Sequence, residues 1–197
     1  MPSEEATDPG AGTDRADRSS DRADRSSDLI GRPAESLAEL ADIEAIKQLK
    51  HAYFRLLDSK QFDELGLLLC VDATTSYESG KYAHHGRDEV VSFLSDSLGD
   101  RAIVHEHLGH HPEIVLTGPT TAVGNWYLHD RVIVAGVDFE LGGTALYRDE
   151  YEKVDGAWRI RHTGYERVYE EQRKLSTGEL TSFRDRFSPE TQNPGSA

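Results

Sequence analysis

The chain has 197 residues, a formal net charge of −14 and a pI of about 5.0. Nucleic-acid binding needs a basic footprint, so this charge argues against DNA or RNA as a partner. The sequence has no apolar stretch long enough to span a bilayer and no signal-peptide pattern, so we expect no membrane partner and a cytoplasmic location. Cys70 is the only cysteine, which excludes an intrachain disulfide, and its apolar neighbours predict a buried side chain.

Both ends of the chain differ in composition from its middle. Residues 1–32 lack Phe, Tyr, Trp and Val and contain the repeated unit Asp-Arg-Ala-Asp-Arg-Ser-Ser, at 14–20 and again at 21–27. Such a segment buries too little apolar surface to offset its ordering entropy, which predicts a disordered polar tail. Residues 172–197 are interpreted as a polar C-terminal tail, which leaves one domain over residues 33–171.

The first predicted helix ends at a carboxylate. It begins at the capping-box pattern of Ser36 or at a second possible start near Asp42, and runs to about Asp58. Its apolar residues have helical spacing and predict a face turned to the core: Ile43, Ile46, Leu49, Tyr53 and Leu56. An aspartate after such a face can point into a cavity, and the negative end of the helix dipole would raise its pKa. Asp58 is therefore a candidate general base, although a solvated helix-end aspartate is an equally good interpretation.

The remaining elements change from helical to strand spacing along the chain. A short helix is predicted over 61–69, a strand over 73–78, a turn region over 80–86 and a helix over 87–98. Strands follow over 102–116, with a break near His111, and over 121–134, 138–154 and 157–169, the last two joined by a turn at Asp155-Gly156. This order predicts an α+β fold in which a cone-like, curved antiparallel sheet wraps on the N-terminal helices. A sheet curved in this way encloses a pocket at one end.

The order of elements and three local runs resemble the SnoaL-like family of the nuclear transport factor two-like superfamily. The runs are His107–Ile114, Gly124–Leu128 and Tyr151–Ile160, and the resemblance covers about Leu37 to Glu171. It implies a small enzyme without a cofactor, and a homodimer formed through the outer face of the sheet.

Two enzyme types in the superfamily imply roles for single residues. The run Leu57-Asp58-Ser59-Lys60 resembles the end of the first helix of scytalone dehydratases, which implies a catalytic role for Asp58 and Tyr77. The run departs from that pattern because Leu57 replaces a functional tyrosine. The pattern of bile acid 7α-dehydratases is more similar in its polar residues, and it implies catalytic roles for Tyr53, Asp58, His107 and Asp130, with Arg167 as a late basic residue.

Strand alternation groups further candidates. His105 and His107 share one strand face, and Trp126 shares a face of the next strand with Asp130, so we expect a histidine to pair with Asp130. The alternative is that these groups lie on a wet rim. Candidate substrate-binding residues are Phe54, Phe93, Trp126, Arg167, His105 and His110, while Trp158 is interpreted as a core residue of its hairpin.

The nine histidines also suggest metal binding. His-x-His pairs of this kind occur in metal sites, but the spacing of the other ligand residues that such sites need is missing, so we predict no metal.

The sequence therefore predicts a dehydratase-like or ketosteroid-isomerase-like lyase or isomerase. It would act by acid–base catalysis on a ring-bearing apolar molecule such as a steroid, terpenoid or polyketide. The alternative is a non-catalytic module of the same fold that binds small molecules or forms dimers, because a fold does not determine a function.

Overall fold

Helices come first along the chain and the long strands follow. The computed structural model describes residues 34–185, so the predicted tail at 1–32 lies outside the described residues. The first half consists of α2 (Leu37–Asp58), α3 (Phe62–Gly66), β1 (Leu69–Tyr77), β2 (Tyr82–His85) and α4 (Arg87–Leu98). The second half consists of β3 (Ile103–Gly118), β4 (Thr121–Val134), the 3-10 turn η1 (Ala135–Val137), β5 (Phe139–Val154), β6 (Ala157–Arg173) and β7 (Leu180–Asp185).

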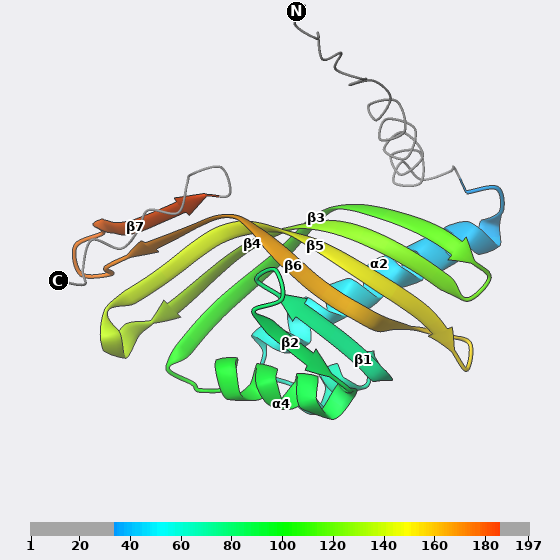
Figure 1. Ribbon diagram of the computed structural model, residues 1–197, viewed down its shortest axis with the longest axis horizontal. Helices are drawn as coiled ribbons and strands as arrows, with labels where there is room; N and C mark the ends of the chain where they lie inside the picture. The colour runs from blue at the N-terminus through cyan, green and yellow to red at the C-terminus, as the bar shows by residue number, and fades with distance from the viewer. Residues whose placement is uncertain (1–33, 186–197) are drawn as a thin grey trace, which may run out of the picture.

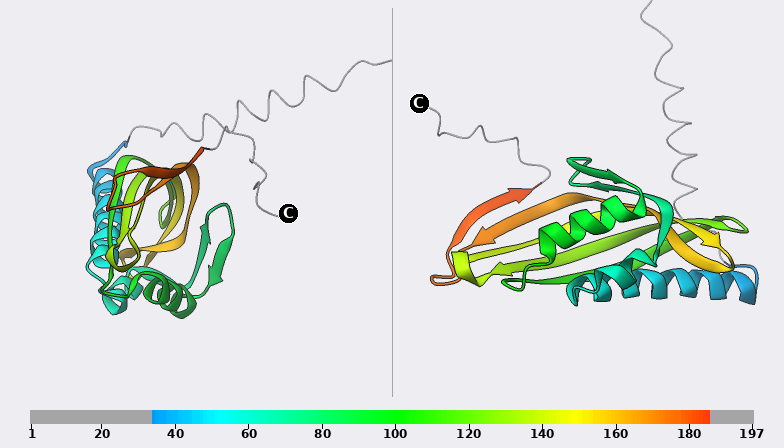
Figure 2. Two further views of the ribbon diagram at one scale, coloured as in Figure 1. Left: turned by 90° about the vertical axis from the view of Figure 1, so that its left-hand side faces the viewer. Right: turned by 90° about the horizontal axis from the view of Figure 1, so that it is seen from below.

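One curved, open sheet holds the seven strands of the described residues. Its order is β2-β1-β6-β5-β4-β3, and β7 pairs with β6. In Figure 1, α2 runs behind the strands and α4 lies below them, and Figure 2 shows how the sheet curves over both helices. The fold class is thus the predicted α+β class. The sheet is mixed rather than wholly antiparallel, because β1 runs parallel to β6.

The predicted start of α2 is confirmed at Ser36. The Ser36 hydroxyl accepts a hydrogen bond from the backbone N–H of Glu39, and the Glu39 carboxylate accepts one from the backbone N–H of Glu35. The first bond satisfies a donor that the first turn of the helix leaves free, and the second ties the residue before the cap to that turn. The helix ends at Asp58, so the buried face of α2 delivers this carboxylate to the inner side of the sheet.

Several predicted boundaries change in the structure. The second helix ends at Gly66, and β1 begins at Leu69. The predicted turn region contains the short edge strand β2, and the segment interpreted as a C-terminal tail contains the end of β6 and all of β7. The predicted break at His111 is a shift in register between His110 and Glu113, where His111 adopts a φ of 50°, and the strand continues beyond it.

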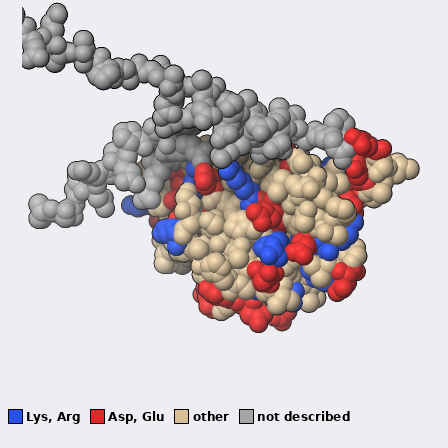
Figure 3. Space-filling view, turned by 45° about the vertical axis from the view of Figure 1, so that its right-hand side comes forward, with Lys and Arg blue, Asp and Glu red and all other residues tan. Residues whose placement is uncertain are grey.

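The core lies between α2 and the inner face of the sheet. Trp158 is 8% exposed and Cys70 is 3% exposed, so both are buried as predicted. The Trp158 ring N–H donates to Asp42 on α2, which ties the β5–β6 hairpin to the first helix. Figure 3 shows acidic and basic side chains interspersed on one face of the molecule, the pattern of a solvated surface. Over residues 34–185, no helix is both long and apolar enough to cross a membrane.

Candidate active site

Asp58 binds two histidines from the neighbouring strand. Its Oδ1 atom lies 2.6 Å from Nδ1 of His107 and 3.1 Å from Nδ1 of His105. Its Oδ2 atom accepts a hydrogen bond of 3.0 Å from the backbone N–H of His107. The three side chains meet because α2 ends against β3, where the two histidines share the inner face by strand alternation.

The protonation state of Asp58 follows from these contacts. Burial raises the pKa of this carboxyl, but hydrogen bonds from His105, His107 and the His107 backbone outweigh it and lower the pKa to about 2. The sequence-based prediction that the helix dipole raises the pKa of Asp58 was wrong. The hydrogen bonds that the carboxylate accepts from the two histidines have a larger effect than the partial charge at the helix end. Asp58 is therefore a carboxylate at neutral pH and accepts hydrogen bonds only.

The tautomer of His107 follows in turn. A carboxylate acceptor requires its Nδ1 atom to carry the proton, which makes Nε2 of a neutral ring a proton acceptor. Among residues 34–185, no hydrogen-bond partner is present for this Nε2 atom, and the ring lines a cavity. The ring of Phe54 lies nearly parallel to the imidazole, with 6.4 Å between centroids. This is the arrangement of a histidine general base oriented by an aspartate.

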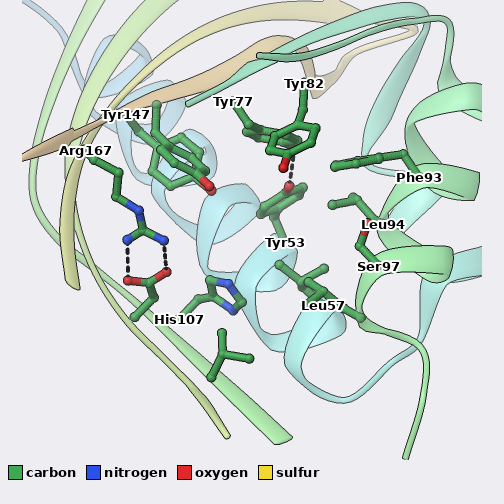
Figure 4. Close-up of a pocket in the computed structure, with 14 residues that line it drawn as sticks. Tyr53, Leu57, Tyr77, Tyr82, Phe93, Leu94, Ser97, His107, Tyr147 and Arg167 are labelled. Carbon is green, nitrogen blue, oxygen red and sulfur yellow. Dashed lines mark hydrogen bonds and ion pairs between the residues drawn. The ribbon is translucent and has the colours of Figure 1, made fainter. Parts of the chain in front are cut away.

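The cavity next to His107 has a volume of about 280 Å³. One side is aromatic and consists of Tyr53, Tyr77, Tyr82, Phe93, Tyr147 and Tyr165. Helix α4 contributes Leu94, Ser97 and Leu98, while Leu57 and Val132 complete the apolar part. Figure 4 shows His107 and Arg167 on one side of this space and Phe93 on the other.

Two tyrosines from different elements share a hydrogen bond at the cavity. The hydroxyl oxygens of Tyr53 on α2 and Tyr77 on β1 are 2.9 Å apart (Figure 4). Burial raises the pKa of both phenols, so both are neutral near pH 7. Two hydroxyls carry two protons and their mutual bond uses one, so one proton remains to donate to a bound molecule.

Asp130 pairs with an arginine instead of the expected histidine. Arg167 donates two hydrogen bonds to it, from Nη1 to Oδ1 at 2.6 Å and from Nη2 to Oδ2 at 2.7 Å. Although His107 and Asp130 are opposite each other in the β3–β4 register, the guanidinium of Arg167 matches a carboxylate in a two-point geometry that an imidazole cannot offer. Both residues line the cavity, so the pair is a polar, nearly neutral part of its wall.

Other predicted site residues lie outside the cavity lining. Trp126 is 1% exposed and donates from its ring N–H to the Tyr151 hydroxyl at 2.9 Å, so it is a core residue. Phe54 packs on the backbone of Gly109, where a Cβ atom would lie 2.4 Å from its ring. His105 is buried behind His107, and His110 is exposed on the outer face of β3.

Sequence reasoning missed several lining residues. Tyr147 and Tyr165 lie opposite each other on β5 and β6, and both line the cavity. Alternation along β5 puts Tyr147 on the inner face with Tyr151, but it did not indicate which inner-face residues border the cavity. Alternation from Trp158 would put Tyr165 on the outer face, and a register shift between Ile160 and His162 reverses this. Tyr82 was missed because it lies in the unpredicted strand β2.

Asp58, His105 and His107 are also residue types that bind metal ions, and their ligand atoms lie within 4.8 Å of one another. The donor set fits hydrogen bonding better, because both Nδ1 atoms point at the same carboxylate oxygen at hydrogen-bond distance. The geometry therefore favours acid–base chemistry.

Solved structures of similar fold include several from Novosphingobium and one from Streptomyces. A proposed scytalone dehydratase from Novosphingobium aromaticivorans is 20% identical, with a TM-score of 0.59 over 81% of this chain and 97% of the other. A hexachlorocyclohexane dehydrochlorinase, LinA-type3 from Novosphingobium barchaimii, is 17% identical, with a TM-score of 0.60 over 80% and 99% of the two chains. ActVI-ORFA from Streptomyces coelicolor is 17% identical, with a TM-score of 0.56 over 64% and 97%.

These similarities establish the fold, and a family model gives the membership. Residues 38–164 match the model of the SnoaL-like domain, which is more than half of the chain. The chain therefore belongs to the SnoaL-like domain family.

Proposed function

We propose that this protein is a cofactor-independent lyase or isomerase that removes a proton from carbon in a small, ring-bearing apolar substrate. The observation that carries the proposal is the 2.6 Å contact between Asp58 and Nδ1 of His107, with the other ring nitrogen left to act at a cavity. A neutral imidazole held in one tautomer is suited to proton transfer near pH 7.

His107 is the base of the proposed reaction. Its Nε2 atom takes a proton from a carbon next to a carbonyl, and Asp58 stabilises the imidazolium that forms. The electron pair of the broken C–H bond then forms an enolate. It proceeds either to a new double bond as a neighbouring hydroxide or halide leaves, or to a shifted double bond when the proton returns elsewhere.

Tyr53 and Tyr77 stabilise the developing oxygen charge. Their pair has one free hydroxyl proton, and an oxygen that gains charge in the transition state accepts a stronger hydrogen bond than the ground-state carbonyl does. The proposal therefore places the substrate carbonyl at the tyrosine pair and the acidic carbon at His107.

The cavity wall supports an apolar, ring-bearing substrate. Its volume of about 280 Å³ and its aromatic side fit a molecule of one to a few rings. Steroid, terpenoid and polyketide skeletons are of this type. The solved dehydratase and dehydrochlorinase of the same fold act by elimination according to their names, which supports the same reaction type here.

Deuterium incorporation tests the proposal without a known substrate. Cyclic ketones with and without a β-hydroxyl or β-halide group are incubated with the protein in D₂O and followed by mass spectrometry. We expect deuterium uptake or elimination with the wild type, and a loss of about 10²- to 10⁴-fold with His107→Gln. His129→Gln is the matched control, because His129 is exposed on the outer face of β4.

The proposal fails if ketones bind, as shown by chemical-shift changes of cavity residues, and none exchanges or eliminates faster than in buffer. That result would favour the alternative of a non-catalytic binding module. Equal rates for wild type and His107→Gln would also exclude His107 as the base.

A further inference from the structure

Lys60 lies directly behind the proposed catalytic pair. It follows α2 with a φ of 58°, a conformation that turns the chain sharply after Asp58. Its Nζ atom donates to the backbone carbonyl of Leu98 and, at 2.9 Å, to that of Ile103. The third contact of Nζ is Nε2 of His105, at 3.1 Å. The three donors of the ammonium group are thus all used.

The contact with His105 has one consistent arrangement of protons. A charged ammonium has no acceptor, so Nε2 of His105 must be unprotonated to accept from Lys60. Nδ1 must then carry the proton, and it lies 3.1 Å from the Asp58 carboxylate. The bonds form a directed chain from Lys60 through His105 to Asp58.

We propose that Lys60 is a positioning residue that locks His105 in its neutral, Nδ1-protonated form and thereby keeps Asp58 available to orient His107. In this arrangement His105 supplies Asp58 with a hydrogen bond but no positive charge. The positive charge in direct contact with Asp58 is then the one that forms on His107 during proton transfer.

The charges around His105 agree with this role. Lys60 and Asp58 face it directly, His107 lies beside it on β3, and the carboxylate of Asp100 acts on Lys60 from the loop after α4. Burial lowers the pKa of Lys60, while Asp100 and Asp58 oppose that change and favour the charged form. The cation is held in place by carbonyls from two elements, so it cannot follow His105 if that ring turns.

Removal of Lys60 would remove the hydrogen-bond donor that holds His105 in this tautomer. Nε2 of His105 then has no donor in front of it, so the ring can hold its proton there or become doubly protonated. A doubly protonated His105 would compete with His107 for Asp58 and weaken the base. This consequence for catalysis rests on the proposed function, whereas the tautomer of His105 does not.

Long-range ¹H–¹⁵N NMR of the histidine rings in the full-length protein tests the inference. In the wild type at pH 7 we expect His105 to show a protonated Nδ1 and the downfield signal of an unprotonated Nε2. Lys60→Met should lose that downfield signal, and Lys60→Arg should retain it because a guanidinium also only donates. Lys47→Met, which removes a partly exposed cation from α2, should leave the signal unchanged.

A wild-type His105 that carries its proton on Nε2, or on both nitrogens, at pH 7 would overturn the inference, and this measurement needs no variant. An unchanged His105 spectrum in a folded Lys60→Met protein would do the same. The deuterium experiment is separate: a locked His105 in a protein without exchange activity would refute the proposed function and leave the role of Lys60 intact.

Discussion

Asp58 accepts three hydrogen bonds on two oxygens, which supports the orienting role proposed for it. An ionised aspartate that already accepts three hydrogen bonds is a poor site for a substrate proton, while it holds the ring of His107 in one orientation. The sequence predicted catalytic roles for Asp58 and His107 and made Asp58 the candidate general base, whereas the contacts favour His107 as the base and Asp58 as the group that orients it. The proposed division of roles depends on the direction of the hydrogen bond between them, in which Nδ1 of His107 donates to Asp58 and Nε2 is left as the proton acceptor.

Asp58→Asn should therefore reduce proton transfer through His107. An amide has one acceptor oxygen for the three N–H groups that face Asp58, so its NH₂ group must face either the His107 backbone N–H or the two imidazoles. In the second orientation His107 can turn to the tautomer that carries its proton on Nε2. We expect the exchange rate to fall by about 10²- to 10⁴-fold. Deuterium incorporation measures the rate. Glu106→Gln is the control, because Glu106 is an exposed acid on the outer face of β3. A wild-type rate in Asp58→Asn would contradict the orienting role.

The stability of the fold should depend on pH through the same carboxyl. The pKa of Asp58 is about 2 in the folded protein, below its ordinary value of 3.8. The bonds to its carboxylate therefore stabilise the fold above about pH 4, and this contribution is lost as the pH falls towards 2. We expect wild type to exceed Asp58→Asn by about 1 to 2 kcal/mol at pH 6, and the difference to shrink by pH 2.5. Urea unfolding at both pH values measures this difference in the free energy of unfolding. A difference that grows in acid would contradict the lowered pKa of Asp58.

At the scale of the elements, the spacing of apolar residues correctly predicted those features that depend on residues close together in the chain. The bounds of β4 and the start of α2 follow from alternation and capping, and they agree with the structure. Strand β2 was missed because it has only four residues, and β7 because its segment is largely polar. The parallel pairing of β1 with β6 joins strands far apart in the chain, so local sequence carries no direct signal for it.

The site was predicted only in part, because it too depends on contacts between residues far apart in the chain. Alternation placed Trp126 and Asp130 on one face correctly, but α2 covers that face at Trp126 and leaves it open near Asp130. The partner of Asp130 comes from β6, two strands away in the sheet, which no spacing along β4 could indicate. Residue type and face are properties of the sequence, whereas the limits of a cavity depend on how elements cross.

The docking of α2 on the sheet involves a buried ion pair, which leads to a prediction. Lys50 is fully buried, with its Nζ 2.8 Å from Oδ2 of Asp149 and 3.8 Å from the centre of the Tyr147 ring. Burial lowers the pKa of Lys50, and Asp149 opposes this. Lys50→Met should leave a buried carboxylate without its cation and destabilise the fold by about 3 to 5 kcal/mol.

Thermal and urea unfolding measure that loss, with the double variant Lys50→Met/Asp149→Asn as the matched comparison. The double variant removes both charges and should recover part of the stability, because the penalty comes from the unpaired carboxylate. If the double variant is less stable than the single one, the pair matters for its shape and hydrogen bonds instead of its charge balance.

At the scale of the whole molecule, the outer face of the sheet exposes apolar side chains opposite the site. Val104 is 60% exposed, Leu108 is 41% exposed and Tyr127 is 48% exposed. Strand register places them on the same face of the neighbouring strands β3 and β4. Apolar side chains grouped in this way mark interaction surfaces more often than isolated ones do.

We therefore predict a homodimer formed through this outer face. Self-association of one patch about a two-fold axis would bury these residues on both copies and leave the cavity on the inner face open. Sedimentation velocity at micromolar concentration should show a dimer for the wild type and a monomer for Leu108→Lys/Tyr127→Lys. Leu67→Lys is the control, because Leu67 is 63% exposed in the turn before β1 and lies off this face. A wild-type monomer would refute the dimer, while a dimer that survives the double substitution would place the interface elsewhere on the molecule.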